Sequence, residues 1–496
     1  MSRFLAITFF RLVQQRAATF QSDVITYAAA KLPFATVLAV TTVGLSGCYN
    51  HQFQKSEPAA VKGIKSKVQI GVIEFDDMGE LFNRCDLSPQ DDQPCQLIEV
   101  QKWIELQRKA AAPVPTVVVT FVHGWDNNAA PSNDDLRQFS TELDRLQYGS
   151  EASLHVIGVY IGWRGSSTPG RHTIEYFWTV FNREAAAHRV ASVSATEVLF
   201  RIRDSAKKTL PGVGRGGFVL VGHSFGGLIV ERTLAQALTA FMVLSADRNP
   251  DDRTCEGGGV QPFADLTVLI NPAIDAIETQ QLIDMMKRAR VKTCSPNKGF
   301  QPPLLGSIKS QTDNATGFAF VFGHTLESEN KVFRHYGDAP ALSSETDPKP
   351  PSQWSVYKHT AGSLSYYQNY CFIEDGNAGD NACKDVAKEV NEERNKLGNP
   401  KEASLAFPKN TPNYQQAFAN SAYPNPVAQN LYTRFRGKCT YDKCDVWNNT
   451  PYWIFTVPND VVAGHSGWAS SKLALLLEDI VRETLLAEKS KTIGFD

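Results

Sequence analysis

The sequence lacks a strong charge of either sign. Its 496 residues include 50 basic and 52 acidic side chains, which gives a formal net charge of −2. A chain so nearly neutral has no global field to hold a polyanion, and this argues against nucleic acid as a partner. Internal repeats and long low-complexity tracts are also absent, and the apolar fraction of 42% indicates a globular protein with a sizeable core.

Near the N-terminus, the apolar stretch is too short for an ordinary membrane span. Residues 32–47 carry no charge and follow Lys31, but they number only 16, whereas a spanning helix needs about 20. A basic flank, an apolar segment and a small-residue exit are typical of a secretory signal. The stretch ends in Leu-Ser-Gly-Cys48, which resembles a bacterial lipobox, in which the cysteine is lipidated.

We therefore expect a lipoprotein-type signal over 1–47, a lipid anchor on Cys48 and a polar tether over 48–66. The protein would be exported and held at the cell envelope by that anchor. In a Gram-negative cell, Tyr49 would permit sorting to the outer membrane. The alternative is an uncleaved N-terminal helix with an incidental cysteine. The stretch before Lys31 is long for the basic region of a signal, which favours a true start downstream of Met1, for example at Val24.

No Cys-x-x-Cys motif occurs, which argues against a structural zinc site. An even set of eight cysteines remains after Cys48, as is appropriate to an oxidising compartment. Because short loops cost the least entropy to close, neighbours in sequence are the favoured disulfide partners. The eight cysteines are Cys85, Cys95, Cys255, Cys294, Cys371, Cys383, Cys439 and Cys444.

Strand and helix patterns alternate over the first part of the folded chain, which predicts a parallel sheet covered on both faces. The expected strands are 68–75, 115–122, 154–161, 218–221, 266–270 and 304–308. The expected helices are 96–111, 134–146, 173–208, 228–245 and 278–290.

The alternation stops over about 326–450 and resumes with a strand at 452–457 and a helix at 469–486. We interpret 326–450 as an insertion, with one charged helix near 383–396, into a domain made of 67–325 and 451–496. A separate C-terminal domain is the alternative. The insertion is either a lid over the site or a disulfide-stapled surface decoration.

Gly-His-Ser224-Phe-Gly-Gly directly follows one expected strand and precedes an expected helix. This is the context of a nucleophile elbow, in which a sharp turn presents the serine above the sheet. Acyl transfer also needs amide donors for an oxyanion. We expect these from Phe225, after the serine, and from Trp125, in the His-Gly-Trp125 loop after the strand 115–122.

A base and an orienting acid should follow Ser224 in the order acid, then histidine. His465 is the histidine that lies between the last strand and the last helix, whereas His223 is interpreted as structural. The acid is Asp313, after the strand 304–308, or alternatively Asp275, after the preceding strand. The loop after the later strand is the commoner place for the acid, which favours Asp313.

Several segments together resemble a bacterial family of α/β-hydrolase proteins, esterase- or lipase-like and of poorly defined substrate. The resemblance covers about 68–322 and the stretch around His465, and it implies a triad of Ser224, Asp313 and His465. The segments that carry it are 73–80, 121–125, 159–165, 222–227, 269–273 and 310–316.

The expected fold is thus α/β, of the α/β-hydrolase type, and the expected activity is cleavage of carboxylic esters through an acyl-enzyme on Ser224. The substrate would be a small ester or a lipid, and the mechanism needs no metal or organic cofactor. An acyltransferase or a peptidase would use the same triad. A non-catalytic envelope lipoprotein could keep the fold as a binding scaffold.

Overall fold

The computed structural model describes residues 68–82, 96–149, 154–165, 174–246, 260, 262–288, 303–316, 320–321, 324, 331–333, 351–364, 366–374, 377–378, 431–435, 450–474 and 476–477. The expected signal, the tether, Cys48 and the charged helix near 383–396 lie outside these residues. Of the cysteines predicted to pair, only Cys371 falls within a described strand.

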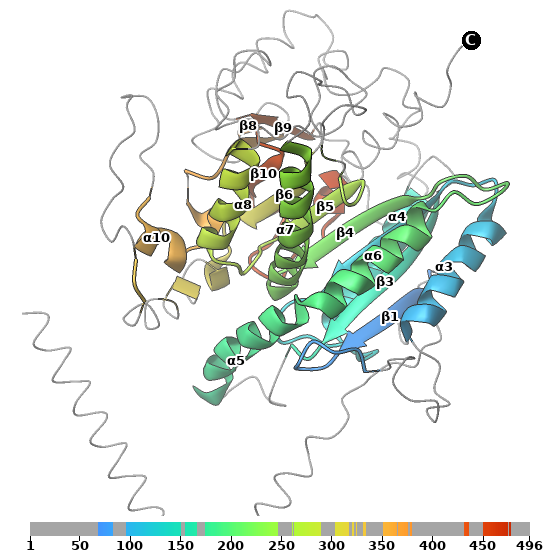
Figure 1. Ribbon diagram of the computed structural model, residues 1–496, viewed down its shortest axis with the longest axis horizontal. Helices are drawn as coiled ribbons and strands as arrows, with labels where there is room; N and C mark the ends of the chain where they lie inside the picture. The colour runs from blue at the N-terminus through green and yellow to red at the C-terminus, as the bar shows by residue number, and fades with distance from the viewer. Residues whose placement is uncertain are drawn as a thin grey trace, which may run out of the picture. The chain divides into compact units, whose positions relative to one another are not determined.

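Seven strands form one sheet, in the order β1-β3-β2-β4-β5-β6-β10, and every pairing between neighbours is parallel (Figure 1). The strands are β1 (Ile70–Phe75), β2 (Thr116–Val122), β3 (His155–Trp163), β4 (Gly217–His223), β5 (Leu266–Ile270), β6 (Leu305–Ser310) and β10 (Tyr452–Val457). All residues of β2, β4 and β5 are buried, which explains why these strands are nearly continuous apolar runs.

Helices cover both faces of the sheet, so the predicted α/β class is confirmed. One core is packed by α3 (Gln96–Ala111), α5 (Ile174–Val190), α6 (Val193–Lys207), α7 (Phe225–Ala246) and α8 (Ala276–Arg288). The other core is packed by α4 (Asp134–Gly149) and by helical residues within 471–477.

Four predicted helices differ from the structure, and two of them, α4 and α8, differ only by two or three residues at their ends. The stretch 173–208, expected to be helical throughout, forms two helices, because Ser192 adopts an extended conformation (φ −94°, ψ −156°) and starts α6. The helix expected from Leu228 begins at Phe225, because the carbonyl of Ser224 accepts the first turn's hydrogen bonds from Gly227 and Leu228.

Between β6 and β10 the chain leaves the main sheet. It forms α10 (Gln353–Lys358), the short 3₁₀ helix η3 (Ala361–Ser363), and an antiparallel sheet of order β8-β7-β9. The strands of that sheet are β7 (Tyr370–Glu374), β8 (Asn377–Ala378) and β9 (Leu431–Phe435). Asn369, just before β7, bonds to the backbone of Tyr452 and Ile454, and this attaches the excursion to β10.

None of the helices in the part of the chain that the structure describes has the length and apolar character needed to cross a bilayer.

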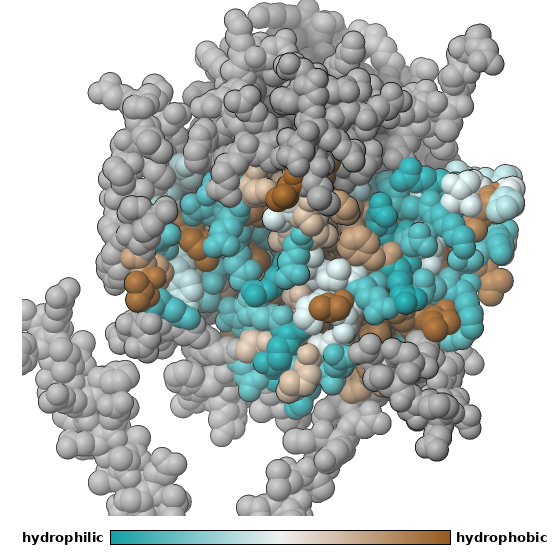
Figure 2. Space-filling model, viewed as in Figure 1, coloured by the Kyte–Doolittle hydropathy of each residue, from teal (hydrophilic) through white to brown (hydrophobic). Residues whose placement is uncertain are grey.

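On the described face drawn in Figure 2, apolar residues are scattered among polar ones rather than gathered in one patch. The large apolar side chains most exposed among the described residues belong to several elements. Single exposed apolar residues are ordinary on a protein surface. They include Met78, Leu106, Val193, Phe241, Val243 and Val332.

The order of the strands marks one position at the edge of the sheet. From β2 the chain moves to β3 on one side, and it then crosses back over β2 to form β4 on the other side. In open parallel sheets, ligands bind outside the carboxyl ends of the strands where the winding direction reverses. Here that point lies between β2 and β4, which are followed by His123-Gly124-Trp125 and by Ser224.

Candidate active site

Ser224 occupies a strained turn between β4 and α7. Its φ is +55°, in the left-handed region that a non-glycine residue rarely adopts, and its amide donates to the carbonyl of Ile270 at 3.0 Å. The turn is possible because Gly222 and Gly226 lie backbone to backbone. A Cβ on Gly226 would be 2.0 Å from the carbonyl oxygen of Val122, a distance that no side chain tolerates. The two glycines therefore allow the chain to pack closely around this turn, and that packing holds Ser224 in its strained conformation.

The structure brings Ser224, His465 and Asp313 together in one hydrogen-bonded chain, with His465 in the middle. His465 Nε2 lies 2.8 Å from Ser224 Oγ, and His465 Nδ1 lies 3.0 Å from Asp313 Oδ1. Ser224 is 3% exposed and the Asp313 carboxylate is fully buried, while the His465 side chain is 21% exposed. A base in contact with both a hydroxyl and a buried carboxylate is the arrangement that activates a serine.

The Asp313 carboxylate is saturated with donors. Oδ1 accepts from the amides of Ala315 (3.0 Å) and Thr316 (3.1 Å) as well as from His465, and Oδ2 accepts from the Thr316 hydroxyl. Burial opposes the charge of Asp313, but the hydrogen bond and charge of His465, with those of Lys309 and Thr316, hold the pKa of Asp313 well below its usual value. The group is therefore ionised throughout the physiological pH range.

The loop that carries His465 is fixed from below by Asn271, which follows β5. Asn271 Nδ2 donates to the carbonyls of Gly464 and His465, both at 2.9 Å, and its Oδ1 accepts from the amide of Ser310 at 2.7 Å. One buried amide thus joins the ends of β5 and β6 to the histidine loop. It sets the height of the imidazole above the sheet.

His223 holds the same loop from the side of β4. Its Nε2 lies 2.8 Å from the His465 carbonyl, and its Nδ1 faces the buried Asp135 carboxylate at 3.5 Å. Burial disfavours a charged imidazole, but the hydrogen bond and charge of Asp135 outweigh it and raise the pKa of His223. Asp135 also accepts from the Trp468 indole at 3.2 Å. The structural role predicted for His223 is thus that of a support for the His465 loop.

The loop after β2 is anchored by His123. Its Nε2 accepts from the amide of Trp163 at 3.0 Å, and its own carbonyl accepts from the Trp163 indole at 2.8 Å. Burial lowers the pKa of His123 to about 4, so the ring is neutral and able to accept that hydrogen bond. The loop is consequently rigid where it approaches the serine.

The loop after β2 comes very close to Ser224. A Cβ on Gly124 would lie 2.7 Å from the Cβ of Ser224, so only glycine fits between the loop and the elbow. Trp125 is the next residue, and Phe225 is the first of α7, where N–H groups have no partner within the helix. Both predicted oxyanion donors therefore adjoin Ser224 along the chain or across this contact, and their role stays a prediction.

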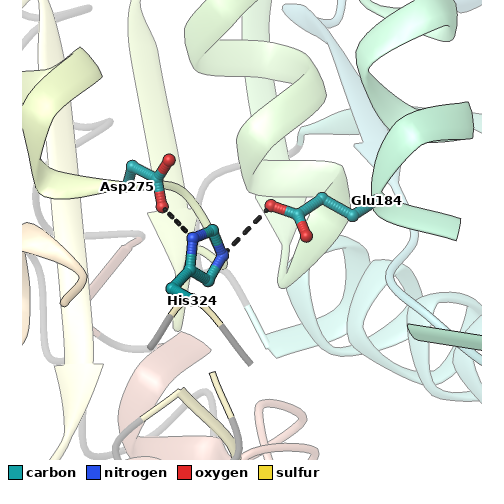
Figure 3. A group of neighbouring side chains, drawn as sticks. All are labelled: Glu184, Asp275 and His324. Atoms are coloured by element: carbon teal, nitrogen blue, oxygen red, sulfur yellow. Dashed lines mark ion pairs between the residues drawn. The ribbon is translucent and has the colours of Figure 1, made fainter. Parts of the chain in front are cut away.

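Asp275, the alternative acid, belongs to another group of side chains. Its carboxylate lies 3.2 Å from His324 Nδ1, and Glu184 lies 3.3 Å from His324 Nε2 (Figure 3). The structure thus pairs Asp275 with His324, whereas it is Asp313 that contacts His465.

Among the described residues, Glu184, Asp275 and His324 are the group whose ligand atoms lie close enough, within 4.8 Å of one another, to hold a metal ion. Figure 3 shows the imidazole between the two carboxylates, with each ring nitrogen directed at one of them. A metal ion needs its ligands gathered around one point. A histidine placed between two carboxylates accounts for this geometry directly, and it ties α5 to the segments that carry Asp275 and His324.

Sequence reasoning missed four residues that surround the triad, namely Asp135, Asn271, Lys309 and Thr316. Asn271 left one signal, since an asparagine directly after a buried strand, in Ile270-Asn271-Pro272, often marks a functional turn. Lys309 and Thr316 are local neighbours of Asp313, four and three residues away, whereas Asp135 is distant from it in the sequence.

No family model, curated protein or solved structure matches the chain, so its function has to be inferred from the geometry of the site.

Proposed function

We propose that the chain is a serine hydrolase of the α/β-hydrolase fold that cleaves carboxylic esters through an acyl-enzyme on Ser224. The observation that supports this most directly is the relay in which His465 contacts Ser224 at 2.8 Å and Asp313 at 3.0 Å. The parallel sheet, the strained turn after β4 and the chain order serine, aspartate, histidine are all features of that fold.

The chemistry divides into two halves. In the first, His465 Nε2 takes the proton of Ser224 as Oγ attacks the ester carbonyl, and Asp313 stabilises the imidazolium that forms. The amides of Trp125 and Phe225 hold the oxyanion, and the alcohol leaves with the proton from His465. In the second half, water attacks the acyl-enzyme by the same route and releases the acid.

Export and anchoring belong to the same proposal. The apolar stretch after Lys31 serves as the signal, and lipidated Cys48 holds the protein at the cell envelope, where small esters or lipids are the substrates. Replacing Cys48 with Ser should abolish incorporation of labelled palmitate and release the protein from the membrane fraction. Incorporation that persists in the variant would contradict this part of the proposal.

The decisive experiment is labelling of the purified protein with a fluorophosphonate, which reacts with activated serines. The wild type should be labelled and Ser224→Ala should not. Ser140→Ala serves as a matched control, since Ser140 is a buried serine on α4 whose hydroxyl has no hydrogen-bond partner. A folded wild type that is not labelled would refute the enzymatic function.

A panel of esters, the corresponding amides and candidate acceptor alcohols then defines the reaction. Ester cleavage with water as the acceptor is the expected result. Preferential amide cleavage would identify a peptidase, and acyl transfer to an added alcohol would identify a transferase, each with the same three residues.

A further inference from the structure

Lys309 is a buried lysine directly behind the proposed triad. It occupies the last but one position of β6, and its side chain is 11% exposed. A buried ammonium is costly unless it is paired. Its Nζ lies 3.8 Å from Asp313 Oδ2 and donates to the Thr316 hydroxyl at 3.1 Å. The lysine thus contacts the carboxylate on the side opposite His465.

The two oxygens of Asp313 have separate partners. Oδ1 contacts His465, whereas Oδ2 accepts from the Thr316 hydroxyl and faces Lys309. Thr316 is itself buried and accepts from Lys309, so ammonium, hydroxyl and carboxylate form one chain. Such a chain fixes the rotation of the carboxylate, because turning it would break the hydrogen bonds on both oxygens.

The stem of Lys309 is covered by η3. A Cβ on Gly362 would lie 2.9 Å from the Cβ and 3.2 Å from the Cδ of Lys309, so this backbone packs directly on the methylene groups. Burial lowers the pKa of the Lys309 ammonium, and the charge of Asp313 opposes that lowering. Packing and charge together hold the ammonium at one place.

We propose that Lys309 is a positioning residue for the triad: acting through Thr316, it fixes the Asp313 carboxylate and offsets part of the field that this carboxylate exerts on His465. The inference rests on the proposed function and adds to it. With the ammonium present, part of the charge of the Asp313 carboxylate is offset on the side away from His465.

Other charged groups also face His465. From β4, the His223 ring has its centroid 5.3 Å from that of His465, and Asp135 of α4 pairs with His223. From β6 and the turn that follows it, the charged groups are Lys309 and Asp313. The variants below leave His223 and Asp135 unchanged, so a shift in the pH dependence reports on Lys309.

The test compares Lys309→Met, Lys309→Arg and Thr316→Val in the full chain. With Lys309→Met, the midpoint of the acid limb of kcat/KM should rise by roughly half to one pH unit, because one positive charge near the base is lost. Lys309→Arg keeps the positive charge, so the acid limb of its kcat/KM profile should coincide with that of the wild type. Thr316→Val should lower kcat without moving the limb, because the ammonium remains.

Lys207→Met is the matched control. Lys207 is also a buried lysine paired with a buried aspartate, Asp265, but it lies on α6 away from the site. Lys207→Met should lower the melting temperature of the protein and leave the acid limb of the kcat/KM profile at the wild-type pH. If Lys309→Met folds and its limb coincides with that of the wild type, Lys309 only fills space and the proposal is wrong. Should Lys309→Met not fold, Lys309→Gln provides the same comparison.

A second readout does not depend on catalysis. In ¹⁵N-histidine-labelled protein, the His465 resonances, assigned with His465→Gln, should titrate at higher pH in Lys309→Met than in the wild type. This result stands even if the wild type hydrolyses no ester, so failure of the proposed function and failure of the role of Lys309 remain distinguishable. Coincident titrations would overturn the inference.

Discussion

At the scale of single residues, the site depends on how closely the loop after β2 approaches the elbow. A Cβ on Gly124 would lie 2.7 Å from the Cβ of Ser224 and 3.0 Å from the carbonyl oxygen of His223. Neither neighbour can retreat, because Ser224 is held in its left-handed conformation by the turn around it. The position of Ser224, the proposed nucleophile, therefore depends on the lack of a side chain on Gly124.

We predict that Gly124→Ala slows labelling of Ser224 by a fluorophosphonate by roughly 10²-fold or more, because a displacement of about 1 Å at a reacting atom costs that much. The rate of labelling is the measurement. Gly306→Ala is the control, since a Cβ there meets nothing closer than 3.6 Å, and its rate should be unchanged. Equal labelling rates for Gly124→Ala and wild type would show that the loop after β2 can move enough to accommodate the added methyl group.

The two aspartates considered for the triad should behave differently when neutralised. Asp313→Asn removes the carboxylate bonded to His465 and should lower kcat by roughly 10³- to 10⁴-fold. Asp275→Asn removes a partner of His324 and should leave kcat within a few-fold of wild type. Steady-state hydrolysis of an activated ester measures both. The opposite ranking would assign the acid to Asp275.

At the scale of elements, the histidine loop depends on a side chain from a neighbouring strand end. Asn271→Ala removes two hydrogen bonds to the backbone at Gly464 and His465, and we predict a fall of about 10- to 100-fold in kcat with little change in KM. Asn369→Ala is the matched control, because Asn369 bonds the backbone of β10 in the same way but away from His465. It should lower stability and leave kcat unchanged.

The elements also show what the sequence can predict. Strands β5 and β10 and helix α3 were predicted with their observed bounds, because apolar periodicity and length specify them locally. Ser224 was found by its turn between a strand and a helix, and His465 by its place in the order of elements. Lys309 and Thr316 lie within four residues of Asp313, but sequence spacing does not show which neighbours a carboxylate contacts, and here the turn after β6 decides it.

At the scale of the whole molecule, a buried acid links three elements on one face of the sheet. Glu231 of α7 accepts from the Thr279 hydroxyl of α8 and from the Tyr452 hydroxyl of β10, each at 2.7 Å. Burial raises the pKa of Glu231 to about 7, although both hydroxyls favour its charged form. The folded protein therefore binds a proton that the unfolded chain releases at lower pH.

We predict that this proton makes stability depend on pH. A raised pKa in the folded state stabilises fully below the unfolded value of 4.5, and the stabilisation is lost as pH rises to about 7. Relative to Glu231→Gln, the wild type should lose on the order of 3 kcal/mol in free energy of unfolding over that interval. Urea denaturation between pH 4.5 and 8 is the measurement.

Glu99→Gln is the control for this prediction. Glu99 is an exposed acid paired with Lys102 on the surface of α3, so its neutralisation should leave the pH dependence of wild type in place. Parallel curves for wild type and Glu231→Gln would mean that folding does not raise the pKa of Glu231.

The distance along the chain between the proposed nucleophile and its base has a consequence for synthesis. His465 follows Ser224 by 241 residues, and at about 5 to 20 residues per second a ribosome needs roughly 10 to 50 seconds to add them. Until then Ser224 is an ordinary alcohol, and β6 has an open edge that only β10 will cover. On this proposal, a nascent chain cannot hydrolyse anything around it until β10 and the loop after it have emerged.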